Sequence, residues 1–251
     1  MMRVGHKGAD AIVPGNSIES FRAASEVGVD AIEFDVLRPP EDFADGSDWR
    51  TAQPGPAEGA APILVAHDWG AVRRAKAPLT LDRALDAFTE PPLDRVKLDL
   101  DIKISGREDE IVAAVRSRGL AERTMTSGTE IPTIRILGEI APELGRGWTI
   151  PRVSRDWTKS RALRPLVLGG MATMRARLPR RVRQEAPRLG VESIWIHHAL
   201  ATPALAAAAH DVECALIAWT VDDATRMSEL AAMGVDGICT NDPRLFARLA
   251  D

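Results

Sequence analysis

Short strand-like runs alternate with helix-like segments along the whole chain. Apolar runs at residues 31–36 and 215–221 are typical of buried strands, and residues 222–233 show helical spacing that ends at Gly234. Consecutive parallel strands need a long crossover connection, which is usually a helix. The alternation therefore predicts a parallel sheet covered by helices. A length of 251 residues is enough for one large α/β barrel or for two small domains.

Nine strand candidates can be counted, which is one more than a (β/α)8 barrel needs. The weakest are residues 147–150 and 193–196, and the sequence alone does not say which candidate lies outside the barrel. We predict an α/β fold, a (β/α)8 TIM barrel, as a single domain over residues 1–251 with a long loop at 37–61 after the second strand. A doubly wound open sheet is the alternative, but no glycine-rich dinucleotide fingerprint follows the first strand. The other candidates are residues 4–6, 31–36, 63–67, 96–103, 123–127, 215–221 and 237–240.

The first helix is predicted over residues 16–27. Asn16 is a favourable N-cap residue, and Glu19 follows three positions later, which is the spacing of a capping box. We therefore expect the Asn16 side chain to bind backbone N–H groups at the start of this helix.

Polar chemistry collects at the ends of successive strand candidates. Glu33 and Asp35 are two residues apart in an apolar run, so both carboxylates project from the same face of the strand. Asp99 and Asp101 repeat this spacing, and the pair is followed by Lys103. Buried like charges are costly unless a cation or a proton offsets them, and paired carboxylate oxygens suit a hard divalent cation.

The overall composition narrows the class of protein. A net charge of −4 and a pI of about 5.8 do not suggest a nucleic-acid binder. Cys214 and Cys239 lie in apolar runs and are expected to be buried thiols. No apolar run approaches the roughly 20 residues that span a bilayer, and no signal peptide is visible, so we expect a soluble cytoplasmic enzyme. Eleven arginines over residues 146–188 are either solvated helix faces or a basic surface for weak contact with anionic membrane lipid.

Seven motifs, taken in order, resemble those of the glycerophosphodiester phosphodiesterase family. The resemblance spans nearly the whole chain, and its strength lies in the order of the motifs, since each is weak alone. The matching pieces are His6-Lys7-Gly8, Pro14-Gly15-Asn16-Ser17, Glu33-Phe34-Asp35-Val36, His67-Asp68, the helix entry at 79–81, Asp101-Ile102-Lys103, and the closing segments 218–222 and 234–243.

The resemblance implies a TIM-barrel phosphoric diester hydrolase. Its substrate would be a small glycerophosphodiester, cleaved to glycerol 3-phosphate and an alcohol. It also implies that a divalent cation, Mg²⁺ or Ca²⁺, is held by Glu33, Asp35 and Asp101. His6 and His67 would act as general acid and general base.

Elementary chemistry supports these roles. A divalent cation would neutralise the charge that protects a phosphodiester from nucleophiles, and imidazoles suit proton transfer near neutral pH. Lys7 and Lys103 are expected to stabilise the phosphoryl oxygens, and Trp219 is either a contact for the glycerol carbons or a core residue. The chain departs from the family pattern where Lys7 replaces an arginine, Gly15 a glutamate and Asp101 a glutamate.

Several other functions stay open at this point. One is a different TIM-barrel enzyme, such as a metal-dependent lyase, which would not require two histidines. A second is a lysophospholipase D-like lipid phosphodiesterase. A third is a non-catalytic descendant that binds phosphodiesters, which the three departures favour. The sequence does not indicate the head group of the substrate, the choice of cation or the oligomeric state.

Overall fold

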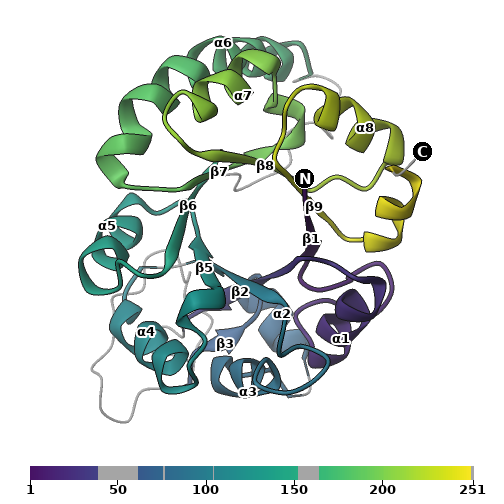
Figure 1. Cartoon of the computed structure of the whole chain (residues 1–251), viewed down its shortest axis with the longest axis vertical. Helices are drawn as coiled ribbons and strands as arrows, with labels where there is room; N and C mark the ends of the chain where they lie inside the picture. The colour runs from purple at the N-terminus through teal and green to yellow at the C-terminus, as the bar shows by residue number, and fades with distance from the viewer. Residues whose placement is uncertain (39–61, 76, 104, 152–163, 250–251) are drawn as a thin grey trace.

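Eight parallel strands close into a barrel in the computed structural model, which confirms the predicted (β/α)8 architecture (Figure 1). The structure describes residues 1–38, 62–75, 77–103, 105–151 and 164–249, so most of the predicted loop at 37–61 lies outside the described residues. Pairing of the first strand with both the second and the last closes the ring. The barrel strands are β1 (Met2–His6), β2 (Ala31–Leu37), β4 (Lys97–Ile102), β5 (Thr124–Ser127), β6 (Gly145–Ile150), β7 (Ser193–His197), β8 (Ala215–Trp219) and β9 (Gly237–Thr240).

The strand candidate outside the barrel is the one at residues 63–67. Its paired part is β3 (Leu64–Val65), two residues long and antiparallel to the end of β2, with Val36 opposite Val65. His67 therefore follows a strand that lies outside the barrel. A short apolar run has the same sequence pattern in a barrel strand and in a strand at the edge of the barrel. The pattern indicates that the side chains are buried, but it does not indicate the direction of the strand. The two weakest candidates, at 147–150 and 193–196, are the barrel strands β6 and β7.

The helices surround the barrel on its outside (Figure 1). Between β2 and β4 the chain forms β3 and two short helices, and one α-helix lies between each other pair of consecutive barrel strands. The helices are α1 (Ile18–Val27), α2 (Trp69–Arg74), α3 (Leu81–Ala87), α4 (Glu108–Ser117), α5 (Ile131–Ile140), α6 (Arg164–Leu189), α7 (Pro203–His210) and α8 (Ala224–Ala232).

The start of α1 differs from the prediction. Ser17, and not Asn16, is the N-cap, and its hydroxyl accepts a hydrogen bond from the backbone N–H of Ser20 at 3.2 Å. Asn16 has a left-handed backbone, with φ of 57°, and its side chain turns towards β2. Asparagine adopts this conformation more readily than most residues. The predicted N-cap, Asn16, is therefore one residue too early in the chain.

The core lies mainly between the barrel and the helices. Phe21, Phe34 and Phe88 form an aromatic cluster with ring centroids 5.1 to 5.7 Å apart, which fixes α1 and α3 against β2. Cys214 and Cys239 are free, buried thiols, as predicted. Among the described residues, no helix has the length and apolar character needed to cross a membrane.

The arginines of α6 are largely engaged with the protein itself where the structure describes them. Arg183 pairs with Asp211 at 2.7 Å, and the Arg181 guanidinium lies 4.8 Å from the centre of the Trp148 ring. Arg175 donates to the carbonyl oxygen of Ala199. These contacts favour the interpretation as helix faces, since three of the cations already have partners.

Candidate functional site

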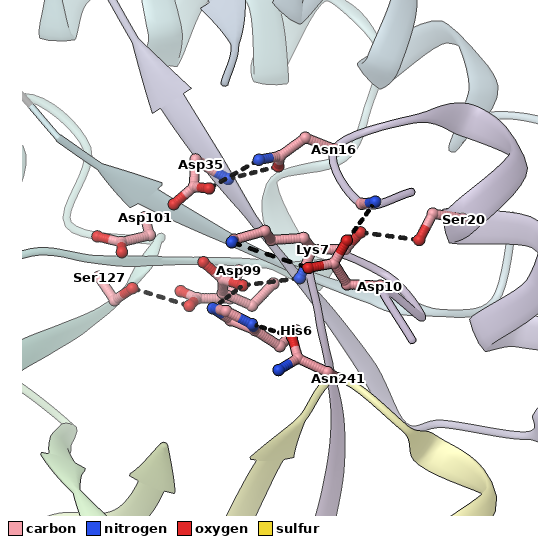
Figure 2. Close-up of polar contacts among 12 residues, drawn as sticks. His6, Lys7, Asp10, Asn16, Ser20, Asp35, Asp99, Asp101, Ser127 and Asn241 are labelled. Atoms are coloured by element: carbon pink, nitrogen blue, oxygen red, sulfur yellow. Dashed lines mark hydrogen bonds and ion pairs between the residues drawn. The ribbon is translucent and has the colours of Figure 1, made fainter. Parts of the chain in front are cut away.

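Three carboxylates converge at the carboxyl ends of β2 and β4. Strand register places Glu33 opposite Asp99 and Asp35 opposite Asp101. One oxygen from each of Glu33, Asp35 and Asp101 lies within 4.8 Å of the others, and Figure 2 shows Asp35 and Asp101 facing the same space. Asp99 lies one step further down the strand, where it accepts a hydrogen bond from the Ser127 hydroxyl at 2.8 Å. The structure thus brings together the three carboxylates predicted to bind the cation.

The ammonium group of Lys103 lies against this cluster. It forms ion pairs with Asp35, at 2.5 Å, and with Asp101. Burial alone would raise the pKa of Asp35, but the charge and hydrogen bond of Lys103, together with the neighbouring charges of His67 and Lys7, outweigh it and hold that pKa below its ordinary value. Burial and the charge of Asp35 raise the pKa of Glu33 well above its ordinary range. These opposite shifts show a cluster with more negative charge than one ammonium can balance.

His6 ends β1 and lies beside Glu33, as the register of the two strands requires. Its Nε2 is 3.9 Å from Glu33 Oε2, and its Nδ1 is 2.6 Å from the side-chain oxygen of Asn241. Burial, helped by the neighbouring charge of Lys7, lowers the pKa of His6 to about 4. The ring is therefore neutral at pH 7, which suits a proton acceptor.

Lys7 and Asn16 bind the carboxylates through the loop that follows β1. With a φ of 53°, Lys7 turns the chain so that its backbone N–H donates to Glu33 Oε2 at 3.0 Å. The Asn16 amide donates to Asp35 Oδ2 at 2.7 Å, and its oxygen accepts from the Asp35 backbone N–H at 3.1 Å (Figure 2). This role of Asn16 was not predicted from the sequence. The available signal was the Pro-Gly-Asn turn, since asparagine tolerates left-handed backbone there.

His67 and Lys7 line a cleft of about 710 Å³ beside the carboxylates. The carboxylates are not part of its lining, but Lys7 and Asn16 are, and these two contact Glu33 and Asp35. The imidazole of His67 is 55% exposed, and its Nδ1 is 3.1 Å from Asp68 Oδ2. The structure therefore places the second histidine in an open cleft, on the segment between β3 and α2.

Trp219 ends β8 and is half-buried. Its ring meets the ring of His197 edge-on, with centroids 5.3 Å apart, and packs against apolar side chains inside the barrel. It does not line the cleft beside His67. This packing favours the core alternative for Trp219 over a contact with the glycerol carbons.

The chemistry of the cluster fits a hard divalent cation. All three groups offer oxygen ligands, and Lys103 already supplies a positive charge between Asp35 and Asp101. Cation binding would relieve the repulsion that raises the pKa of Glu33. The donor set does not distinguish Mg²⁺ from Ca²⁺.

Sequence comparison links the chain to one family. The model of the "Glycerophosphoryl diester phosphodiesterase family" matches residues 6–38 and 102–245, which is more than half of the chain. The matched parts include His6, Glu33, Asp35 and Lys103, whereas His67 and Asp101 lie between them. None of the curated proteins compared with the chain matches it.

Solved structures of similar fold include two described as glycerophosphodiester phosphodiesterases. The one from Parabacteroides distasonis is 20% identical, with a TM-score of 0.69, and 98% of this chain and 97% of that chain align. The one from Agrobacterium tumefaciens is 20% identical, with a TM-score of 0.66, over 100% and 99% of the two chains. A phosphodiesterase of Oleispira antarctica, in complex with the product sn-glycerol-3-phosphate, is 13% identical, with a TM-score of 0.66, over 100% and 97%.

Proposed function

Because the chain belongs to the glycerophosphoryl diester phosphodiesterase family, and is therefore a phosphoric diester hydrolase, we propose how its own residues cleave the substrate. The substrate is a glycerophosphodiester, and the products are glycerol 3-phosphate and an alcohol. Glu33, Asp35 and Asp101 hold a divalent cation, Mg²⁺ or Ca²⁺, and His6 and His67 transfer the protons. The observation that carries this proposal is the convergence of two buried carboxylates and the partly buried Asp101 beside His6.

The cation supplies Lewis-acid chemistry when it is bound, by neutralising the charge on the phosphoryl oxygens. The residues of the chain do the remaining work. Lys103 and Lys7 bring positive charge to the same place from β4 and from the loop after β1. An ammonium group held in a partly buried site stabilises developing negative charge more strongly than it would in water.

The two histidines provide the acid and the base. Attack on phosphorus by a hydroxyl group or by water requires that the nucleophile loses a proton, and the departing alkoxide must gain one. His6 lies beside the carboxylates, and His67 lines the neighbouring cleft. We propose that this cleft receives the alcohol portion of the diester, since it is the open space next to the cluster. The glycerol 3-phosphate bound to the Oleispira antarctica phosphodiesterase, which shares the fold, supports a glycerophosphate as the retained product.

Release of glycerol 3-phosphate from glycerophosphocholine tests the proposal. We expect turnover with Mg²⁺ or Ca²⁺ present, loss of turnover after treatment with EDTA, and recovery when the cation is added back. The control is circular dichroism of the EDTA-treated protein, which should show an intact fold. Full turnover in EDTA would refute the role of the cation, and no release from any glycerophosphodiester in the presence of the cation would refute the substrate class.

A further inference from the structure

Asn241 lies directly after β9 and connects His6 to Asp222. Its side-chain oxygen is 2.6 Å from His6 Nδ1, and its side-chain Nδ2 donates to Asp222 Oδ2 at 2.6 Å (Figure 2 shows the contact with His6). Asp222 Oδ1 accepts from the backbone N–H of Asn241 at 2.8 Å and from the Thr240 hydroxyl at 3.0 Å. Asp222 therefore holds Asn241 by two hydrogen bonds and the preceding Thr240 by a third, although Asp222 itself is exposed.

These contacts define which end of the Asn241 amide faces the histidine. A carboxylate can only accept hydrogen bonds, so the group of Asn241 that faces Asp222 must be the NH₂. The reversed amide would place its oxygen against a carboxylate oxygen, without a proton between them. The amide oxygen must consequently face His6, and it can only accept. The neutral ring of His6 then has to carry its proton on Nδ1.

We propose that Asp222, acting through Asn241, holds a proton on Nδ1 of His6, leaves Nε2 as the nitrogen that accepts a proton, and so makes His6 the general base of the reaction. Nε2 then carries the free electron pair, and it is the nitrogen that lies nearer to Glu33, at 3.9 Å. Asp222 and Asn241 are positioning residues in this account. The inference rests on the proposed function, because only a hydrolase needs the base, but the tautomer can be observed without turnover.

The assignment divides the protons between the two histidines. The attacking water transfers a proton to His6 Nε2 as its oxygen bonds to phosphorus, and the bond from phosphorus to the departing oxygen breaks with its electron pair on that oxygen. Protonated His67 gives its proton to this oxygen. The Asp68 carboxylate lies 3.1 Å from His67 Nδ1, whereas the group that faces His6 Nδ1 is the neutral amide of Asn241.

Nitrogen NMR of the ¹⁵N-labelled full chain, near neutral pH, tests the tautomer. Two-bond correlations between ring protons and ring nitrogens distinguish a protonated nitrogen from a bare one, and His6→Gln identifies the His6 signals. We expect Nδ1 protonated and Nε2 bare in the wild-type protein. The opposite pattern would overturn the proposal whatever the activity of the enzyme.

A pair of isosteric substitutions tests the role of Asp222. In Asp222→Asn, the side-chain oxygen stays in the place of Oδ1, because the Thr240 hydroxyl and the backbone N–H of Asn241 still donate to it. The new NH₂ group therefore faces the NH₂ group of Asn241. Rotation of the Asn241 amide relieves this clash and turns its NH₂ towards His6. The proton of His6 should then move to Nε2, and kcat should fall by about 10²-fold or more, which is the usual contribution of a positioned base.

The double variant Asp222→Asn/Asn241→Asp should reverse this change. The carboxylate at position 241 accepts from both His6 Nδ1 and the new amide at 222, so the proton returns to Nδ1 and kcat recovers at least in part. The matched control is Asp223→Asn, at the neighbouring N-cap of α8, where the side chain accepts from the backbone N–H of Arg226 at 2.8 Å. It should leave the His6 spectrum unchanged.

The outcomes separate this inference from the proposed function. An unchanged His6 tautomer in Asp222→Asn, or a double variant that does not restore it, would overturn the role of Asp222 even in an active enzyme. A wild-type Nδ1–H signal that moves and returns as expected would support that role. If the same protein then released no glycerol 3-phosphate, the proposed function and the assignment of His6 as base would fail together.

Discussion

His6 and His67 are held in opposite electrostatic settings. His6 ends a barrel strand, is largely buried and contacts the amide of Asn241. His67 belongs to the segment after β3, outside the barrel, is 55% exposed and contacts the carboxylate of Asp68. Burial lowers the pKa of His6 to about 4, so its neutral form dominates at physiological pH.

This difference supports the proposed roles of His6 as general base and His67 as general acid. A neutral imidazole can accept a proton, and a charged imidazole beside a carboxylate can give one. In the proposed mechanism, the barrel wall carries the groups that need fixed geometry, namely the carboxylates and His6 as the base. The cleft wall carries His67, which in that mechanism has to meet a variable leaving alcohol.

Removal of charge from the barrel wall should have the largest effect. Glu33→Gln and Asp35→Asn should abolish or greatly weaken binding of Mg²⁺ or Ca²⁺, and with it turnover, because each removes an oxygen ligand from the cluster. Isothermal titration calorimetry measures the affinity. Asp99→Asn is the matched control, since burial raises the pKa of Asp99 well above its ordinary value and an amide closely resembles the neutral acid. Equal affinity in all three variants would remove Glu33 and Asp35 from the cation site.

Replacement of the histidines should separate base from acid. His6→Ala and His67→Ala should each lower kcat by about 10² to 10⁴-fold on a glycerophosphodiester with an alkyl leaving group. A p-nitrophenyl diester, whose leaving group needs no proton, should restore most of the activity of His67→Ala and little of that of His6→Ala. Steady-state kinetics on both substrates measures the two ratios. A rescue that is equal for both variants would contradict the contrast.

The fold could be predicted from the sequence because strand periodicity and the order of elements are local properties. Residues 237–240 form β9 as predicted, and β2 carries Glu33 and Asp35 on one face. The position of β3 could not be predicted, since a two-residue strand carries no signal for its direction or its partner. Antiparallel pairing with β2 is decided by tertiary contacts that no local pattern records.

Residues of the candidate site could be predicted where the spacing of charged residues is unusual. They could not be predicted where a side chain contacts a residue that is far away in the sequence. Paired carboxylates in an apolar strand stand out, so the pairs Glu33/Asp35 and Asp99/Asp101 could be proposed from their spacing. The choice of Asp101 over Asp99 came from the family resemblance. Asn16 looked like a helix cap, although its amide binds Asp35, 19 residues away. Asn241 is 235 residues from His6, and only the closed barrel brings the two together.

Lys7 connects the two walls and should tolerate arginine but not loss of charge. Its backbone N–H binds Glu33 on the barrel side, and its side chain lines the cleft with His67. Lys7→Arg should retain activity, because the cleft leaves room for a larger cation that can bind phosphate in a bidentate way. Lys7→Met should lower kcat by about 10²-fold, as expected when one donor to a developing oxyanion is lost. If Lys7→Arg were as inactive as Lys7→Met in a folded protein, the pocket would be specific for lysine.

The smallest effect is expected at the opposite end of β1, where Arg3 pairs with Asp30 at 2.8 Å on the surface. The side-chain hydrogen bond from Arg3 lowers the pKa of Asp30, so the folded state is favoured at any pH above the unfolded pKa of about 3.9. This contribution is lost as the pH falls through the lower folded-state pKa. The pair is about half exposed, so Asp30→Asn should cost only about 0.2–1 kcal/mol of unfolding free energy at pH 7, and nothing at pH 2. Urea denaturation at both pH values measures it, and kcat should not change. A large loss of kcat in Asp30→Asn would show that this end of the barrel is coupled to the site. It would contradict the expectation that the N-terminal ends of the strands serve stability and their C-terminal ends serve chemistry.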